Sequence, residues 1–117
     1  MSQLKLNISQ GSVIFNFSPE AALALKAELT TLMQSLKNIA ARVASGGKRP
    51  KPKPTMEYRH GGEVFLEVYC NPNIYPSPFA AKVLITVRDD RIRLTTEAEL
   101  TRILEDVNHY LEQCSES

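Results

Sequence analysis

The side chains that most often carry out chemistry in proteins are few and scattered in this sequence. It contains two cysteines, Cys70 and Cys114, and two histidines, His60 and His109. Metal sites need such ligands in clusters, and a catalytic nucleophile needs a base held beside it. No such pattern accompanies Cys70, and His109 follows Glu105 by four residues, the spacing of a pair on a helix surface. The sequence therefore predicts no metal, no cofactor, no catalytic residues and a protein that is not an enzyme.

Length and composition place the chain among small globular domains. Its 117 residues are 43% hydrophobic, enough for one domain with a buried core, and the formal net charge is +1. No stretch approaches the roughly 20 apolar residues of a membrane span, and the first residues lack the basic and apolar regions of a signal peptide. We therefore expect a single domain over residues 1–117 in the cytoplasm, without membrane insertion and with both cysteines reduced.

The small net charge conceals a strong segregation of charge along the chain. Residues 46–59 carry five bases and one acid, whereas residues 96–117 carry one base and six acids. Nucleic acid would be attracted to the first segment and repelled by the second. The overall charge therefore does not by itself indicate a nucleic-acid-binding protein.

A long helix is predicted over residues 18–44. Ser18 and Pro19 have the residue types of a helix N-cap and first helical position. Apolar residues then recur at alternating spacings of three and four, which places them on one face: Ala22, Leu25, Leu29, Leu32, Leu36, Ile39 and Val43.

The opposite face of this helix carries little charge; its residues are Ala24, Ala27, Thr31, Gln34, Asn38 and Ala41. A helix face in water normally carries more charged side chains. We therefore expect the helix to be covered by its own sheet and also by a second copy of the chain. The residues predicted for this self-association are Leu25, Leu29, Leu32 and Leu36.

Alternating apolar residues predict a β-hairpin before the long helix and another after it. In the first, residues 4–8 and 13–17 flank a turn at residues 10–11, which would place Ile8 opposite Val13. In the second, a turn at Asp89-Asp90 would place Val87 opposite Ile92. Thr96 to Glu99 has the pattern of a capping box and predicts the start of the last helix. The acidic residues expected to face water there are Glu97, Glu105, Asp106 and Glu112.

Further segments lie between the two hairpin–helix units. Residues 46–56 alternate lysine and proline, which predicts an extended basic linker. Residues 64–69 predict a third strand with both faces covered, because Phe65 and Tyr69 lie opposite the other apolar residues. Residues 71–81 contain three prolines and predict a long loop. The expected fold class is α+β: two β-hairpin–helix units plus one extra strand (ββα–linker–βββα), with an antiparallel sheet packed against two helices.

The linker and the loop are also the predicted partner-binding surfaces. Exposed rigid aromatic side chains make good contact anchors, and a lysine–proline segment suits an acidic protein groove or a phosphate backbone. The alternatives are that the linker is only a solvated spacer and that the loop folds back over the edge of the sheet. The residues are Ile74, Tyr75 and Phe79 in the loop, and Lys48, Arg49, Lys51 and Lys53 in the linker.

A second basic surface is predicted on the last hairpin, where Arg88 would lie opposite Arg91. Like charges in these positions are unfavourable unless neutralised. Asp89 and Asp90 could do this within the turn, or a phosphate or an acidic partner could do it from outside. Arg88, Arg91 and Arg93 are therefore the residues of an alternative nucleic-acid-binding surface.

The function predicted from these features is that of a small non-enzymatic cytosolic protein-interaction module, such as an adaptor, regulator or assembly factor. It would bind another protein and form a homo-oligomer through its long helix. The alternative is a nucleic-acid-binding regulator that uses the basic linker and the basic hairpin face on phosphates.

Overall fold

A computed structural model of the chain describes residues 2–48 and 51–116, and the α+β class with its two hairpin–helix units is confirmed. The strands form two antiparallel sheets, a two-stranded one of β1 and β2 and a four-stranded one in the order β3-β4-β5-β6. The elements are β1 (Gln3–Ile8), β2 (Gly11–Asn16), α1 (Pro19–Ala44), β3 (Met56–His60), β4 (Phe65–Cys70), the short 3-10 helices η1 (Pro72–Ile74) and η2 (Pro78–Ala80), β5 (Lys82–Arg88), β6 (Arg93–Glu99) and α2 (Leu100–Glu116).

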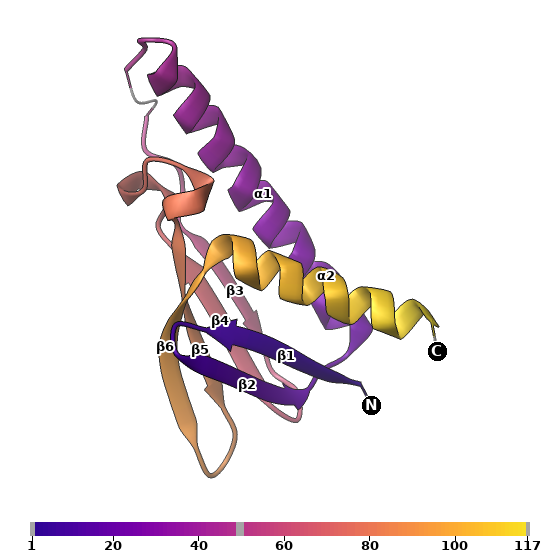
Figure 1. Ribbon diagram of the computed structural model, residues 1–117. Helices are drawn as coiled ribbons and strands as arrows, with labels where there is room; N and C mark the ends of the chain where they lie inside the picture. The colour runs from indigo at the N-terminus through magenta and orange to yellow at the C-terminus, as the bar shows by residue number, and fades with distance from the viewer. Residues whose placement is uncertain (1, 49–50, 117) are drawn as a thin grey trace.

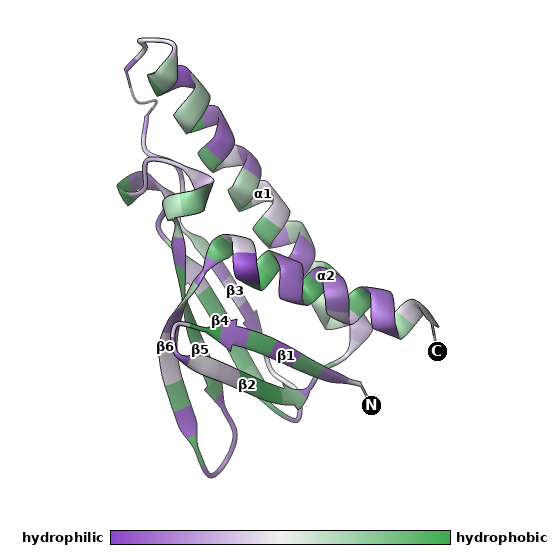
Figure 2. Cartoon of the chain, in the orientation of Figure 1, coloured by the Kyte–Doolittle hydropathy of each residue, from purple (hydrophilic) through white to green (hydrophobic). Residues whose placement is uncertain are grey.

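The helices and the first hairpin all lie on one face of the four-stranded sheet (Figure 1). Hydrophobic and hydrophilic residues alternate along the strands and around both helices, so each element has an apolar side to turn inward (Figure 2). The C-terminal half of α1 extends beyond the sheet, where the 3-10 helices of the loop pack against it. The core therefore lies between the four-stranded sheet, the hairpin and the two helices.

The long helix forms as its sequence predicts. Ser18 is the N-cap, and its Oγ accepts a hydrogen bond from the Ala21 N–H at 3.2 Å. After the helix ends, Gly46 has a φ of 88°, a left-handed conformation that glycine adopts without strain. The predicted apolar seam is buried from Ala22 to Ile39, but Val43 beyond it is 46% exposed because α1 has passed the end of the globule there.

The first hairpin has a different register from the predicted one. Leu6 pairs with Val13 and Ile8 pairs with Gly11, so the turn is Ser9-Gln10 and the pairing is shifted by two residues. Gly11, with a φ of 103°, follows the turn in a conformation that other residues rarely adopt. Since side chains alternate with a period of two, this shift keeps the same apolar residues on the inner face. The buried residues of the hairpin are Leu4, Leu6, Phe15 and, just after β2, Phe17.

The second hairpin is shifted in the same way. Val87 pairs with Leu94 rather than Ile92, which lies in the turn and is 66% exposed. Asp89 closes the turn, because its carboxylate accepts the N–H groups of Arg91 at 2.8 Å and Ile92 at 2.9 Å. The bond from the Ile92 N–H has the largest effect on the carboxyl group, followed by that from the Arg91 N–H. Together they hold the pKa of Asp89 below its usual value.

The last helix begins later than predicted. Residues 96–99 belong to β6, where they pair with β5, and α2 begins at Leu100. Strand pairing thus prevails over the local capping pattern. Asp106 is also not a water-facing residue: its side chain is 9% exposed and accepts the Asn7 N–H at 2.7 Å and the Asn7 side-chain amide at 2.8 Å. These bonds join β1 to α2.

A strand that the sequence analysis missed, β3, lies at one edge of the four-stranded sheet. It begins at Met56, the last residue of the predicted linker, and pairs with β4. Its Tyr58 hydroxyl donates a hydrogen bond to the Ala21 carbonyl oxygen at 2.9 Å, and burial raises the pKa of this tyrosine to about 12. This bond connects β3 to the first turn of α1.

Candidate functional site

The structure brings the two predicted partner-binding segments together through the side chain of Asn73. The Asn73 Oδ1 accepts the Lys53 N–H at 2.7 Å, and the Asn73 Nδ2 donates to the Lys53 carbonyl oxygen at 2.9 Å. The Asn71 Oδ1 in turn accepts hydrogen bonds from the Asn73 N–H and side chain. The amide therefore pairs with the linker backbone as a neighbouring strand would, and it fixes the end of the linker beside the loop.

Within the loop, the predicted contact residues divide into two kinds. Pro72 and Pro78, which open the two 3-10 helices, are buried and anchor the loop. Tyr75 is half-buried against the core, and burial raises its pKa. Ile74 and Phe79 point outward and are 66% and 84% exposed. The side chains of Ile74 and Phe79 are thus the more accessible ones, and Tyr75 is the predicted contact residue that packs partly against the core.

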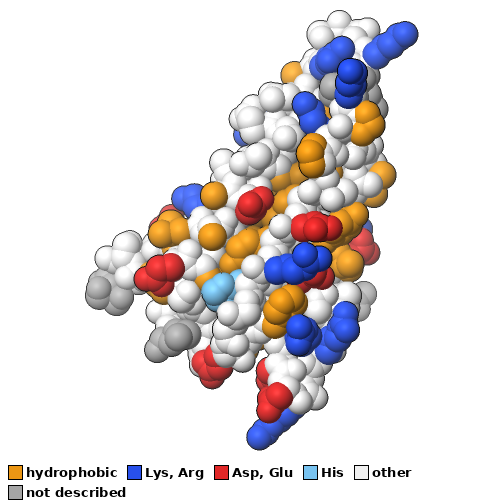
Figure 3. All heavy atoms as spheres, turned by 180° about the vertical axis from the view of Figure 1, so that it is seen from behind, with side chains coloured by type: hydrophobic (Ala, Val, Ile, Leu, Met, Phe, Trp, Pro, Cys, Tyr) orange, Lys and Arg blue, Asp and Glu red, His pale blue; other side chains and the backbone are white. Residues whose placement is uncertain are grey.

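Two long stretches of sequence that meet at this end contain no acidic residues. No Asp or Glu occurs from Leu29 to Met56 or from Val68 to Arg88. In Figure 3 the upper end of the visible face carries Lys and Arg side chains with no Asp or Glu among them, whereas farther down the same face both signs of charge occur. We define the basic end as the exposed residues Lys37, Arg42, Lys48, Lys51, Lys53, Ile74 and Phe79. Arg49 of the predicted set lies outside the described residues.

A small groove lies at this end between α1 and residues 53–56, and we call it the α1 groove. Its volume is about 210 Å³. One wall comes from α1 and the other from the chain that leads into β3. The residues lining it are Glu28, Thr31, Leu32, Ser35, Lys53, Pro54, Thr55, Met56 and Pro72.

The leucines predicted for self-association are buried in the core of their own chain. Leu25, Leu29 and Leu36 are 0% exposed and Leu32 is 4% exposed. The opposite face of α1 is the exposed one, and Leu23 beside it is 57% exposed. Self-association stays a prediction, and in this fold it would use that opposite face.

The arginines of the alternative surface lie near the β5–β6 turn, at the other end of the sheet from the basic end (Figure 1). Arg88 is directly opposite Arg93 rather than Arg91, and its guanidinium lies 4.2 Å from the centre of the Phe65 ring. None of the ion pairs found among the described residues includes Arg88 or Arg93. The two predicted basic surfaces therefore do not form one continuous patch.

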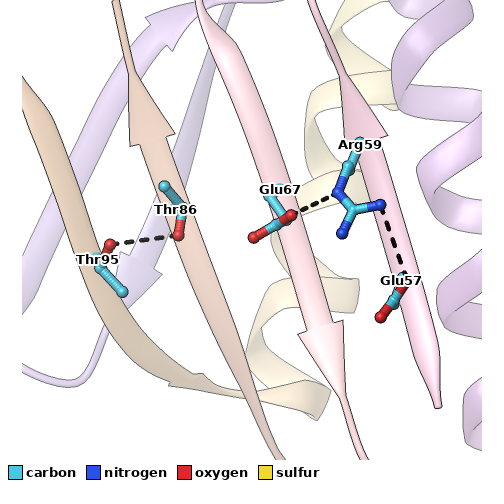
Figure 4. Close-up of polar contacts among 5 residues, drawn as sticks. All are labelled: Glu57, Arg59, Glu67, Thr86 and Thr95. Atoms are coloured by element: carbon cyan, nitrogen blue, oxygen red, sulfur yellow. Dashed lines mark hydrogen bonds and ion pairs between the residues drawn. The ribbon is translucent and has the colours of Figure 1, made fainter.

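The face of β4 that carries Phe65 and Tyr69 was expected to be covered, but no other element of the described chain covers this outer face of the sheet (Figure 4). Its central charges are paired within the sheet, since Arg59 lies 2.6 Å from the Glu67 carboxylate and 3.8 Å from that of Glu57. Thr86 and Thr95 face each other at 3.3 Å. These polar groups are paired within the sheet, which suits a face exposed to water.

The described part of the chain offers little for catalysis or metal binding. Cys70 is 1% exposed, and burial raises the pKa of its thiol to about 11, which disfavours the reactive thiolate. No group of three or more His, Cys, Asp or Glu residues among the described residues is placed to hold a metal ion. Neither described helix combines the length and apolar character needed to cross a membrane.

Comparisons with protein-family models, with curated proteins and with solved structures find no significant match to this chain.

Proposed function

We propose that this protein is a small non-enzymatic interaction module that binds an acidic protein partner through the basic end. The observation that carries the proposal is the pair of hydrogen bonds between Asn73 and the Lys53 backbone. They hold the loop, from which the apolar side chains of Ile74 and Phe79 are exposed, beside the end of the lysine-bearing linker. Apolar anchors surrounded by charges of one sign are typical of surfaces that recognise a partner of the opposite sign.

A protein partner fits this end better than nucleic acid does. Binding to single strands relies on several aromatic side chains on which successive bases stack, and Phe79 is the one aromatic side chain in the basic end as defined above. The acidic residues of α2 would also repel a long polyanion. An acidic protein segment needs neither a stacking series nor an extended basic path.

Nucleic acid remains the second candidate, and the observation that favours it is the Arg88–Arg93 pair. Two like charges directly across a strand pair are unfavourable when no acid neutralises them, and a phosphate would do so. This candidate predicts an affinity that falls steeply as salt rises, because each phosphate contact releases counterions.

The test is an affinity capture of partners from the native lysate, with and without nuclease. Two variants carry equal losses of charge: Lys48, Lys51 and Lys53 to Ser, and Arg88, Arg91 and Arg93 to Ser. A nuclease-resistant protein partner that is lost only with the lysine variant is the expected result. Capture that is nuclease-sensitive, or that is lost only with the arginine variant, would support the nucleic-acid candidate instead.

We also propose that the module acts in the cytoplasm and self-associates through the exposed face of α1 that carries Ala27, Gln34 and Ala41, which do not line the α1 groove. The support is the shortage of charge on that face. Sedimentation at increasing protein concentration should show a dimer, and Ala27→Arg should shift it toward the monomer. A single monomeric species at all concentrations would remove this part of the proposal.

A further inference from the structure

We infer that the α1 groove receives one bulky apolar side chain from the acidic segment that the basic end binds. This inference rests on the proposed function and names the part of the partner that is recognised. It differs from the proposed function in placing a specific anchor between α1 and residues 53–56 rather than on the outer surface of the loop.

The chemistry of the groove suits a single apolar side chain. Leu32 and Met56 are 4% and 7% exposed, and they present apolar atoms at the groove lining together with Pro54. Thr31 and Ser35 of α1 add hydroxyl groups. The volume of about 210 Å³ is smaller than the roughly 300–1,000 Å³ of sites for drug-sized ligands. The groove can therefore accept one side chain but not a typical small molecule.

Both walls of the groove are held in place before any partner arrives. The Lys53 backbone is fixed by Asn73 at 2.7 Å and 2.9 Å. The start of β3 is fixed to α1 by the bond from the Tyr58 hydroxyl to the Ala21 carbonyl oxygen. A site that is already formed loses less conformational entropy on binding, which favours it as a recognition pocket.

The charged residues around the groove indicate the sign of the charge on the bound segment and the direction in which its charges lie. Glu28 is the first α1 residue of the lining, and Lys53 belongs to the stretch that returns from the end of the helix toward Tyr58, whose hydroxyl bonds the Ala21 carbonyl oxygen. Lys51 and Lys48 continue beyond Lys53. An acidic segment would therefore place its carboxylates toward the lysines and away from Glu28, whereas a basic segment would be repelled over most of its length.

The inference is tested with the full chain and labelled synthetic peptides in fluorescence anisotropy. The probes are 12-residue peptides of Asp, Glu and Ser with a central Phe or Leu. The peptides of the set differ in the positions of Asp and Glu relative to the central residue. Matched probes have Ala at the centre, or Lys in place of the acids. We expect the Phe or Leu peptides to bind about tenfold or more tightly than the Ala peptide, and the Lys peptides not to bind. Absence of binding by every acidic Phe and Leu peptide would overturn the inference.

Variants of α1 separate the groove from the surrounding surface. Thr31→Trp fills the groove and should weaken binding about tenfold or more, whereas Thr30→Trp, on another side of the same turn, should change it less than about twofold. Glu28→Gln removes the one acid that lines the groove and should tighten binding about two- to threefold. Glu112→Gln on α2 is the control for the same change of net charge and should have no effect.

The outcomes distinguish the inference from the proposed function. If lysine substitution abolishes partner capture but Thr31→Trp and Glu28→Gln change nothing, the groove is excluded and the module remains. If capture depends on nucleic acid and no acidic peptide binds, both fall. Cross-linking of the Thr31 position to a second copy of this chain would identify the groove as part of a self-association interface and would also overturn the inference.

Discussion

Leu29→Ala should lower the free energy of unfolding by about 2–5 kcal/mol, because the removed atoms leave a cavity that the core fills only in part. Leu29 is 0% exposed and packs in the core between the sheet and the helices. Urea unfolding at low protein concentration measures the change. The matched control is Leu23→Ala in the same helix, where the side chain is 57% exposed and the expected loss is below about 1 kcal/mol.

This comparison also decides between two interpretations of the same leucine seam. Truncation of a residue in the chain's own core lowers the free energy of unfolding equally at all protein concentrations. Truncation of a residue at an interface between copies has a larger effect on the free energy of unfolding at high concentration, where the dimer is populated. A Leu29→Ala effect that disappears on dilution would contradict the burial of this side chain in its own chain and would restore the seam as the surface of self-association.

The parts of the fold that the sequence predicts correctly are those encoded by neighbouring residues. The start of α1 follows from Ser18 and Pro19, and its buried face follows from the spacing of its leucines. The hairpin registers were each wrong by two residues, because the alternation of side chains is the same in both registers. Only the geometry of the turns distinguishes them, and there Gly11 and Asp89 have roles that the residue pattern does not reveal.

Two other errors arose because tertiary pairing prevailed over a local signal. Residues 96–99, which have the cap pattern, form the end of β6 because they pair with β5. The predicted linker ends at Met56 and no element was predicted over residues 57–60, although Met56, Tyr58 and His60 alternate with the charged residues Glu57 and Arg59 as in a strand. Edge strands often carry such charged residues.

The candidate site could be predicted only as two separate segments. The exposed apolar residues of the loop and the lysines of the linker were identified from composition. The contact between the two segments could not be predicted, because it depends on a hydrogen bond between Lys53 and Asn73, which are 20 residues apart in the sequence. The α1 groove was missed for the same reason, since its walls come from residues 28–35 and 53–56. The partial burial of Tyr75 against the core also depends on tertiary packing.

Phe79→Ala should reduce capture of the protein partner about tenfold or more, since truncation of a central aromatic anchor commonly costs 2 kcal/mol or more of binding free energy. The side chain is 84% exposed, so its loss should leave the urea midpoint unchanged. Ile92→Ala is the matched control, because Ile92 is 66% exposed in the β5–β6 turn, away from the basic end. Capture assays and urea unfolding on the same preparations measure both effects.

The two halves of this result test different claims. Loss of capture with Phe79→Ala but not with Ile92→Ala would assign the anchor to the loop that Asn73 fixes beside the lysines. Loss with Ile92→Ala alone would move the interface to the other end of the sheet, near Arg88 and Arg93. Equal capture by both variants would mean that neither exposed side chain is an anchor, and the partner would then be held by the lysine charges alone. In that case capture should fall steeply with salt, because exposed charge pairs are strongly screened.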